Sequence, residues 1–338
     1  MKPRKLKSGS WNLSVYIGKD ADGKKRYRSV TKATRKECII EANRISVKRG
    51  SVLRVAEAVE RYIAAKKNVL SPNTYRSYLA MYNNHIKNDP FGIIPIEVLT
   101  DTQVQKWVSK LATESSPKTV KNIYSLFLAS VKFEDVRLAY NVKLPQRKAV
   151  RLHTPTTAEV MKVMEMAKDN PPLYRAIVLG AVGMMRLGEI CALTAEDIDR
   201  KRNTITISKA MALTADNDIV IKPPKTDASN RTIVLPKYVI DLLPKKGYII
   251  GSTPNAISTA FRKLMKKADV VPFRFHDLRH YAASIAASSS VGASVESIKA
   301  RGGWATDGMM KRIYINQIGD EVDKDTAAIN AYYESKWG

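Results

Sequence analysis

Apolar and polar residues alternate along the N-terminal part of the chain. Over residues 11–17 every second position is apolar, and residues 24–30, after the turn signal Asp22-Gly23, are interpreted as a second strand. This spacing is typical of β-strands that bury one face. Thr34 and Glu37 then have the spacing of a helix capping box. The pattern predicts a small sheet with one helix over residues 1–50.

Between residues 53 and 140 the spacing of the apolar positions changes to that of helices. Ser71 and Ser116 each precede a proline, and Thr100 precedes Gln103 by three positions, which are helix start signals. Each signal opens an amphipathic run. Because the aromatic residues of these runs share a face with aliphatic residues, we interpret them as core and not as platforms for stacked bases. The segment is predicted to be a helical domain.

A basic, proline-containing segment, 141–153, has no apolar periodicity and is typical of a linker between domains. The domain that follows, 154–338, begins with a capping box at Thr156 and Glu159. Its pattern predicts helices, a short β region over about 204–236, and helices again. The chain is therefore expected to have three domains and to be multidomain, mainly α with small β-sheets (α+β).

Basic residues outnumber acidic ones by a wide margin in this 338-residue chain. Its 57 Lys and Arg against 32 Asp and Glu give a formal charge of +25, and the first 50 residues alone hold 15 basic and 4 acidic side chains. This imbalance favours a polyanionic partner, with nucleic acid as the first candidate. Ribosomal, membrane-surface and heparin-binding proteins are also basic, so charge by itself indicates no chemistry.

Cysteine usage and hydropathy point to a cytoplasmic protein. Cys38 and Cys191 lie far apart and neither has the spacing of a zinc site, so we expect no disulfide and no metal. The longest apolar run, Ala176 to Met185, is too short to cross a bilayer, and the basic N-terminus leads into no signal-peptide core. Secretion and membrane insertion are therefore not expected.

Two segments of the third domain carry charged residues that need an explanation. Arg186 ends an almost wholly apolar stretch and Glu189 follows three residues later, which fits a structural helix pair as well as a functional site. Lys225 stands in a polar turn that joins two predicted strands, where a lysine is usually plain surface. Neither segment alone decides between structure and function.

Two further segments contain histidines and aromatic residues. His276, Arg279 and His280 share one face of a predicted helix; two histidines at this spacing can chelate a metal, but the arginine between them argues against it. Trp304 follows a pair of glycines, and Tyr314 ends a short predicted helix. Taken alone, such a tyrosine is more often packing than catalysis.

Together the four segments resemble the catalytic domain of the tyrosine recombinase (phage integrase) family. Its members carry Arg, Lys, His-x-x-Arg, His or Trp, and Tyr in this order. By this resemblance the catalytic set consists of Arg186, Lys225, His276, Arg279, Trp304 and Tyr314, with Glu189 and His280 in supporting roles. The chain departs from the commoner pattern at Trp304, where an indole N–H replaces an ionisable histidine.

The resemblance implies a site-specific DNA recombinase that integrates or excises a mobile element. Tyr314 would attack phosphorus and form a 3′-phosphotyrosyl link, so that rejoining needs no ATP, metal or other cofactor. Arg186 and Arg279 would stabilise the charge of the phosphorane. Lys225 would protonate the departing 5′-oxygen, and His276 would accept or relay the tyrosine proton.

Double-stranded DNA is the partner that the resemblance implies. The helical segment is similar to the family's core-site-binding domain, and the N-terminal module to the arm-binding domains of integrases from phages and conjugative elements. The family further implies a homo-tetramer on two paired sites, a directionality factor and a host DNA-bending protein. The residues that we expect to contact DNA are Arg26, Arg28, Arg76, Lys110, Lys118, Lys121 and Arg231.

Three alternatives stay open at this point. The apolar face of the tail, Ile315 to Gly338, would dock on a neighbouring protomer as in the family, or fold back on its own domain. A type IB topoisomerase shares the tyrosine chemistry but relaxes DNA without recombining it. A DNA-binding regulator, or a degenerate integrase, would bind its sites without cutting them.

Overall fold

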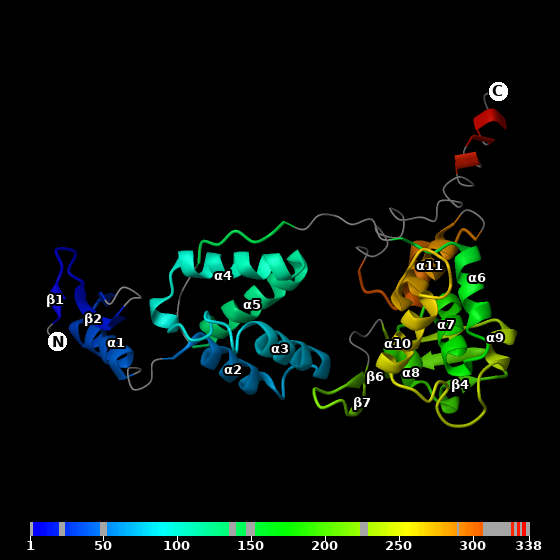
Figure 1. Ribbon diagram of the computed structural model, residues 1–338, viewed down its shortest axis with the longest axis horizontal. Coiled ribbons are helices and arrows are strands. Elements are labelled where there is room, and N and C mark those ends of the chain that lie inside the picture. Colours follow the sequence, from blue (N-terminus) through cyan, green and yellow to red (C-terminus); the bar gives the residue numbers. More distant parts are fainter. Residues whose placement is uncertain are drawn as a thin grey trace. The chain divides into compact units, whose positions relative to one another are not determined.

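A computed structural model describes most of the chain, and it divides into two compact units, Met1–Lys148 and Ala149–Gly338 (Figure 1). The described residues are 3–19, 24–47, 53–134, 140–146, 153–223, 229–288 and 291–306, with 326–327, 330–331 and 333–335 near the C-terminus.

The first unit begins with a three-stranded antiparallel sheet covered by one helix. The strands β1 (Arg4–Lys5), β2 (Trp11–Lys19) and β3 (Lys25–Lys32) lie in that order, and the helix is α1 (Arg35–Val47). The predicted capping box is confirmed, since the Glu37 N–H donates to Thr34 Oγ1 and the Thr34 N–H to Glu37 Oε2, both at 3.2 Å. Leu13, Val15 and Val30 of the sheet pack against Cys38 and Ala42 of the helix.

Four helices and a short 3₁₀ turn make up the rest of the first unit. They are α2 (Val55–Lys66), α3 (Pro72–His85), η2 (Ile96–Val98), α4 (Asp101–Glu114) and α5 (Pro117–Phe133). The three predicted start signals are confirmed: Ser71 and Ser116 cap α3 and α5 and precede a proline, and Thr100 forms a capping box with Gln103 at the start of α4.

The aromatic residues of these helices form the core, as the pattern predicted. Phe91 stacks on Trp107 with ring centroids 4.1 Å apart, and Phe127 meets both rings edge-on.

The start of the predicted linker is held against this domain. The Lys143 N–H donates to Gln105 Oε1 at 2.8 Å, and Gln105 Nε2 donates back to the Lys143 carbonyl at 3.2 Å.

The second unit combines helices with short strands, and the predicted mainly α class with small sheets is confirmed. The helices are α6 (Thr157–Met166), α7 (Pro171–Gly183), α8 (Leu187–Ala192), η3 (Ala195–Asp197), α9 (Lys237–Asp241), α10 (Pro254–Met265), α11 (Phe275–Ala287) and α12 (Val295–Gly302). The strands are β4 (Ile198–Asp199), β5 (Thr204–Ile207), β6 (Ala210–Leu213), β7 (Ile219–Lys222) and β8 (Arg231–Val234).

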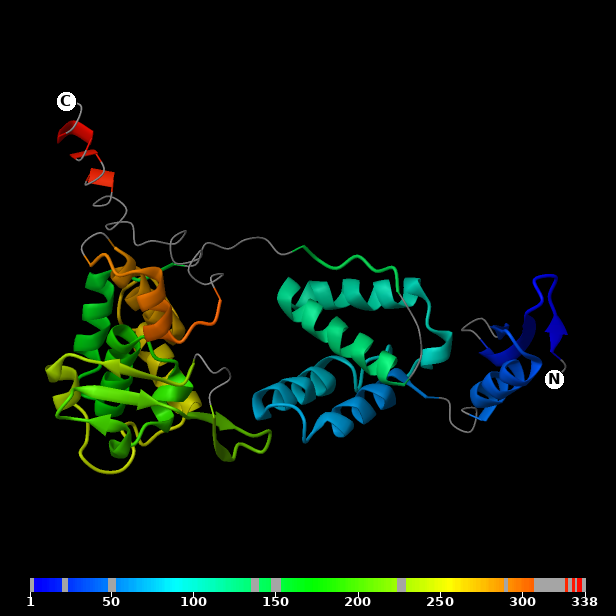
Figure 2. The ribbon, with the colours of Figure 1, turned by 180° about the vertical axis from the view of Figure 1, so that it is seen from behind.

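The strands form two separate sheets. One has the order β4-β5-β8, and the other is the hairpin of β6 and β7, which projects from the body of the unit (Figures 1 and 2). The strands predicted on either side of Lys225 are present as β7 and β8. β7 pairs with β6, and β8 pairs with β5. Each of the two strands therefore has its antiparallel partner earlier in the chain.

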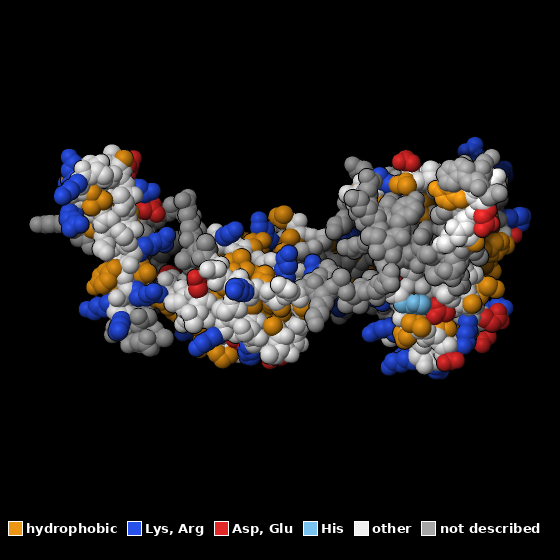
Figure 3. Space-filling view, turned by 90° about the horizontal axis from the view of Figure 1, so that it is seen from above, with side chains coloured by type: hydrophobic (Ala, Val, Ile, Leu, Met, Phe, Trp, Pro, Cys, Tyr) orange, Lys and Arg blue, Asp and Glu red, His pale blue; other side chains and the backbone are white. Residues whose placement is uncertain are grey.

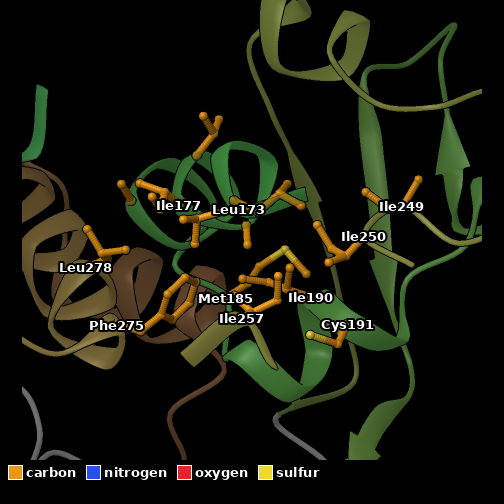
Figure 4. Close-up of a cluster of buried hydrophobic side chains, with 14 of the residues drawn as sticks. Leu173, Ile177, Met185, Ile190, Cys191, Ile249, Ile250, Ile257, Phe275 and Leu278 are labelled. Atoms are coloured by element: carbon orange, nitrogen blue, oxygen red, sulfur yellow. The ribbon is translucent and has the colours of Figure 1, made fainter. Parts of the chain in front are cut away.

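A large hydrophobic core packs α6 to α11 of this unit together. Leu173 and Ile177 of α7 lie opposite Phe275 and Leu278 of α11, with Met185 beside them (Figure 4). The longest apolar run of the sequence is thus the buried end of α7 and the turn after it. In the part of the chain that the structure describes, no helix has the length and apolar character needed to cross a membrane.

Candidate active site

Arg186 is positioned by the turn that ends the buried helix α7. Met184 adopts a left-handed conformation with φ of 53°, and Met185 is fully buried, so the chain leaves α7 in a fixed direction. Arg186 then caps α8. Its N–H donates to Glu189 Oε2 at 2.9 Å, and the side chains form an ion pair at 2.7 Å.

The Arg186 guanidinium has further partners from distant parts of the unit. Nη1 donates to Ser229 Oγ at 3.2 Å as well as to Glu189, and Nη2 donates to the Gly303 carbonyl at 2.9 Å. A guanidinium has five N–H donors. Three are therefore engaged, and Nε and the second hydrogen of Nη2 have no partner among the described residues.

Glu189 is buried between two arginines. Its side chain is 3% exposed, and Arg231 Nη2 lies 3.0 Å from Oε2. Burial alone would raise the pKa of the Glu189 carboxyl, but hydrogen bonds and charge from Arg231, with those of Arg186, outweigh it and hold that pKa below its ordinary value. Glu189 therefore stays ionised and neutralises part of the positive charge around it.

Arg279 lies in α11 and is 1% exposed. Nη1 donates to the Met184 carbonyl, whereas Nε and Nη2 are buried and have no hydrogen-bond partner within the described residues. Burial, and then the charge of Arg186, lower the pKa of the Arg279 guanidinium to about 9, so it remains charged at neutral pH. A buried cation with unpaired donors is costly unless an anion completes it.

Trp304 lies face to face with this cation, 4.1 Å from the guanidinium carbon to the ring centroid. The indole packs in a small cluster with Met184, Ala283 and Ile298. Its position depends on Gly302, because a Cβ added there would overlap the Trp304 ring carbons. The turn at Gly303 has φ of 65° and ends α12.

His276 and His280 share one face of α11, as predicted, with ring centroids 5.0 Å apart and the rings edge to face. Surrounding protein atoms displace water from His276, and His280 and Arg279 place positive charge beside it. Both effects lower the pKa of the His276 imidazole to about 4. The ring still reaches solvent. It is therefore a neutral, accessible acceptor at neutral pH.

The site thus combines two cationic forks, an aromatic wall and a neutral imidazole. This arrangement suits a reaction at an anion with several oxygens, which the two guanidinium groups can bind. The neutral imidazole can accept a proton from a group that reacts with that anion. Lys225 and Tyr314 lie outside the described residues, as does the apolar face predicted for the tail. Among the residues that the structure does describe, no cluster of three or more His, Cys, Asp or Glu is placed to hold a metal ion.

Arg231, predicted as a DNA contact, begins β8 and lies beside Glu189. Its side chain is only 6% exposed and is committed to Glu189, so it does not fit the expected role of a DNA contact. Ser229 and the backbone carbonyls of Met184 and Gly303 were not predicted as parts of the site. Their only signal was the nearness of Ser229 and Arg231 to the turn of Lys225, and carbonyl contacts leave no mark in a sequence.

The remaining basic candidates lie in the first unit. Arg28, Lys118 and Lys121 are exposed. Lys110 is paired with Asp89 at 2.7 Å, and Arg26 Nη1 donates to the Val98 carbonyl at 3.3 Å. Arg76 is half-buried. On the face drawn in Figure 3, Lys and Arg side chains are spread over the N-terminal module and the helical domain with few acidic side chains among them.

Two family models match the chain. One, described as the phage integrase family, matches residues 154–319, and the other, described as the phage integrase N-terminal SAM-like domain, matches residues 55–112. The phiRv2 prophage integrase of Mycobacterium tuberculosis is 26% identical over 270 residues, covering 73% of this chain and 71% of that protein.

Solved structures share the fold at 18% identity. The Tn1549 transposon integrase in complex with transposon right-end DNA has a TM-score of 0.65 over 82% of this chain and 100% of that chain. A lambda integrase tetramer bound to a Holliday junction has a TM-score of 0.57 over 92% of this chain and 94% of that chain. The first family model includes Arg186, His276, Arg279 and Trp304, and the two models together match most of the chain, which belongs to the phage integrase family.

Proposed function

We propose that this protein is a site-specific DNA recombinase that cuts and rejoins strands through a covalent 3′-phosphotyrosyl link to Tyr314, and so integrates or excises a mobile element. Family membership and the mobile-element relatives support this proposal. Its substrate would be double-stranded DNA. We propose a cytoplasmic location, since that is where this substrate would be met.

One observation carries the proposal: the buried guanidinium of Arg279, whose Nε and Nη2 have no partner in the described part of the chain. Arg186, which also has two donors left, adds its charge to the same place, since it lowers the pKa of Arg279. Two like charges held together in a largely buried site call for an anion of more than one oxygen. The non-bridging oxygens of a phosphodiester provide it.

The proposed reaction needs no redox step or outside energy. The Tyr314 oxygen forms a bond to phosphorus, the bond from phosphorus to the 5′-oxygen breaks, and the 5′-hydroxyl leaves. His276, held neutral by its surroundings, takes up the tyrosine proton, and Lys225 supplies one to the leaving oxygen. Arg186 and Arg279 stabilise the charge of the pentavalent phosphorus, and attack by a 5′-hydroxyl reverses the sequence.

DNA binding is assigned to both units. We propose that the basic N-terminal module, residues 1–50, binds arm-type sites and that residues 53–140 bind the core site together with the catalytic domain, 154–338. Arg28, Lys118 and Lys121 are exposed and remain the better phosphate contacts, whereas Lys110 is occupied by Asp89. The tetrameric lambda structure supports assembly as a tetramer on paired sites.

Covalent trapping tests the proposal. The probe is a duplex that carries the junction between the host chromosome and the element encoding this chain, nicked so that cleavage releases a short 5′-hydroxyl fragment. We expect a denaturant-resistant protein–DNA adduct with the wild type and none with Tyr314→Phe. Binding of the junction without an adduct would favour a DNA-binding regulator. An adduct with relaxation of plasmids but no strand exchange between two junctions would favour a topoisomerase.

A further inference from the structure

We propose that Arg231 is a positioning residue of the cleavage site, which holds Arg186 and the turn before Trp304 in register through Glu189 and the Arg301 carbonyl. This inference rests on the proposed function and deepens it. It gives a role to a side chain that carries charge, lies outside the family set described above and cannot reach DNA in its present position.

The contacts of Arg231 engage all three nitrogens of its guanidinium. Nε donates to the Arg301 carbonyl at 2.8 Å and Nη1 donates to the Ser229 carbonyl at 3.1 Å. Nη2 donates to Glu189 Oε2 at 3.0 Å, with a longer bond of 3.3 Å from Nη1 to Oε1. With 6% of the side chain exposed, Arg231 has little surface left for a ligand.

Arg186 shares two of these partners, Glu189 and Ser229, and has a third of its own. It donates to Glu189 Oε1 at 2.7 Å, to the Ser229 hydroxyl at 3.2 Å and to the Gly303 carbonyl at 2.9 Å. Glu189 therefore bridges the two arginines, and Ser229 accepts from one through its hydroxyl and from the other through its carbonyl. The carbonyls of residues 301 and 303 flank Gly302, whose Cα lies against the Trp304 ring.

Three elements far apart in sequence meet at this network. Arg231 begins β8, Glu189 lies in α8, and Arg301 lies at the end of α12. Two of these elements lead to residues of the site, since α8 follows Arg186 and the end of α12 leads to Trp304. Movement of any one against the others would shift a phosphate-binding group by a fraction of a bond length, which is enough to slow a reaction of this kind.

Only arginine can make this set of contacts. Its planar fork presents donors in fixed directions, so one side chain reaches two carbonyls and both oxygens of a carboxylate. A lysine would neutralise Glu189 but could not also bond to the Arg301 carbonyl in the same geometry. A methionine of similar volume would leave Glu189 to Arg186 alone and would lose the bond to the Arg301 carbonyl.

The test measures binding and cleavage separately on the nicked junction duplex. For Arg231→Met we expect a single-turnover cleavage rate about 10- to 100-fold below that of the wild type at saturating protein. The dissociation constant and its salt dependence should stay within about twofold, since no phosphate contact is lost. Arg231→Lys should recover part of the rate. Arg200→Met is the matched control, because Arg200 donates to the carbonyls of Ile240, Leu243 and Pro244 away from the site, and it should cleave at the wild-type rate.

A double-mutant cycle with Arg186→Lys gives the decisive readout. If Arg231 acts through Arg186, Arg231→Met should slow the Arg186→Lys protein by less than about threefold, so that the two losses do not multiply. Three results would overturn the inference without contradicting the proposed recombinase function. They are losses that multiply in full, a wild-type cleavage rate in Arg231→Met, and a weaker DNA affinity of that variant with a smaller salt slope.

Two further outcomes are informative. If the wild type binds the junction without forming an adduct, both the proposed function and the role of Arg231 are wrong. If Arg231→Met fails to fold, as judged by loss of DNA binding and of the thermal transition, the comparison passes to Arg231→Lys. That variant should bind normally and cleave about 5- to 20-fold more slowly, and normal cleavage by it would overturn the inference.

Discussion

The buried guanidinium of Arg279 lowers the stability of the domain that contains it. Two of its nitrogens have no partner in the described residues, and each unpaired buried donor costs about 1–3 kcal/mol. Against this stand the bond to the Met184 carbonyl and the contact with Trp304. A side chain kept in such a state is better explained by what it binds than by what it stabilises.

Replacement of Arg279 should therefore separate activity from stability. For Arg279→Met we expect adduct formation to fall by at least ~100-fold, because the fork that we propose to stabilise the phosphorane is lost. The free energy of unfolding in urea should change by less than about 1 kcal/mol, since the unpaired donors disappear together with the bond to Met184. A loss of several kcal/mol would mean that Arg279 is mainly structural.

His276 makes stability depend on pH in a defined direction. Its pKa is lowered from 6.5 to about 4, so between these values the unfolded chain takes up a proton that the folded chain does not. The free energy of unfolding must then fall as the pH is lowered from about 6.5 towards 4 and be unaffected by this group above 7. We expect the loss to be about 1 kcal/mol, because the solvent-accessible ring is partly screened.

Denaturant unfolding at pH 7 and pH 5 measures this dependence. The difference between the two pH values should be smaller in His276→Gln than in the wild type. His280→Gln is the control for the neighbouring ring, which contributes positive charge beside His276. An equal pH difference in the wild type and His276→Gln would show that the imidazole titrates normally.

At the scale of elements, the end of α12 is the most sensitive part of the site. A Cβ at residue 302 would overlap the ring carbons of Trp304, so Gly302→Ala must displace the indole from Arg279. We expect a loss of about 1–3 kcal/mol in stability from overpacking and a cleavage rate at least ~10-fold lower. Gly180→Ala is the matched control, because its added Cβ would meet Leu278 and Phe275 at 3.5 Å. Normal cleavage by Gly302→Ala would mean that the position of Trp304 does not matter.

The elements themselves were largely predictable, because their signals are local. Ser71, Thr100 and Ser116 mark helix starts within three residues of their partners, and the pairing of Arg186 with Glu189 follows from their spacing. The pairing of β7 with β6 and of β8 with β5 was not predicted. Strand partners are chosen by packing over the whole domain, and the polar turn between β7 and β8 resembles that of a hairpin.

Residues of the candidate site could be predicted only where the type of side chain and its order in the sequence indicate a reaction. Arg231 looked like a surface residue because its partners Glu189 and the Arg301 carbonyl lie 42 and 70 positions away. The bond from Arg186 to the Gly303 carbonyl spans 117 positions. Such contacts arise when the chain folds, and neither periodicity nor composition records them.

At the scale of the whole molecule, the positive charge is unevenly distributed. Residues 1–50 hold 15 of the 57 basic side chains but only 4 of the 32 acidic ones. Their small core of Leu13, Val15, Val30, Cys38 and Ala42 is separate from the core of the helical domain. The module can therefore lend affinity for DNA without taking part in the chemistry, which depends on residues of the second unit.

Deletion of residues 1–50 tests this division of labour. On a short junction duplex the deleted protein should form the covalent adduct at a rate within about threefold of the full chain. On long DNA that includes the flanking arm-type sites, affinity should fall and depend less steeply on salt, by about 0.9 in the logarithmic slope for each phosphate contact removed. A slope smaller by about 2 or more would mean that the module binds the DNA backbone directly. An unchanged slope on long DNA, with cleavage intact, would place the module's partner elsewhere, and its charge would then have to be explained by something other than DNA.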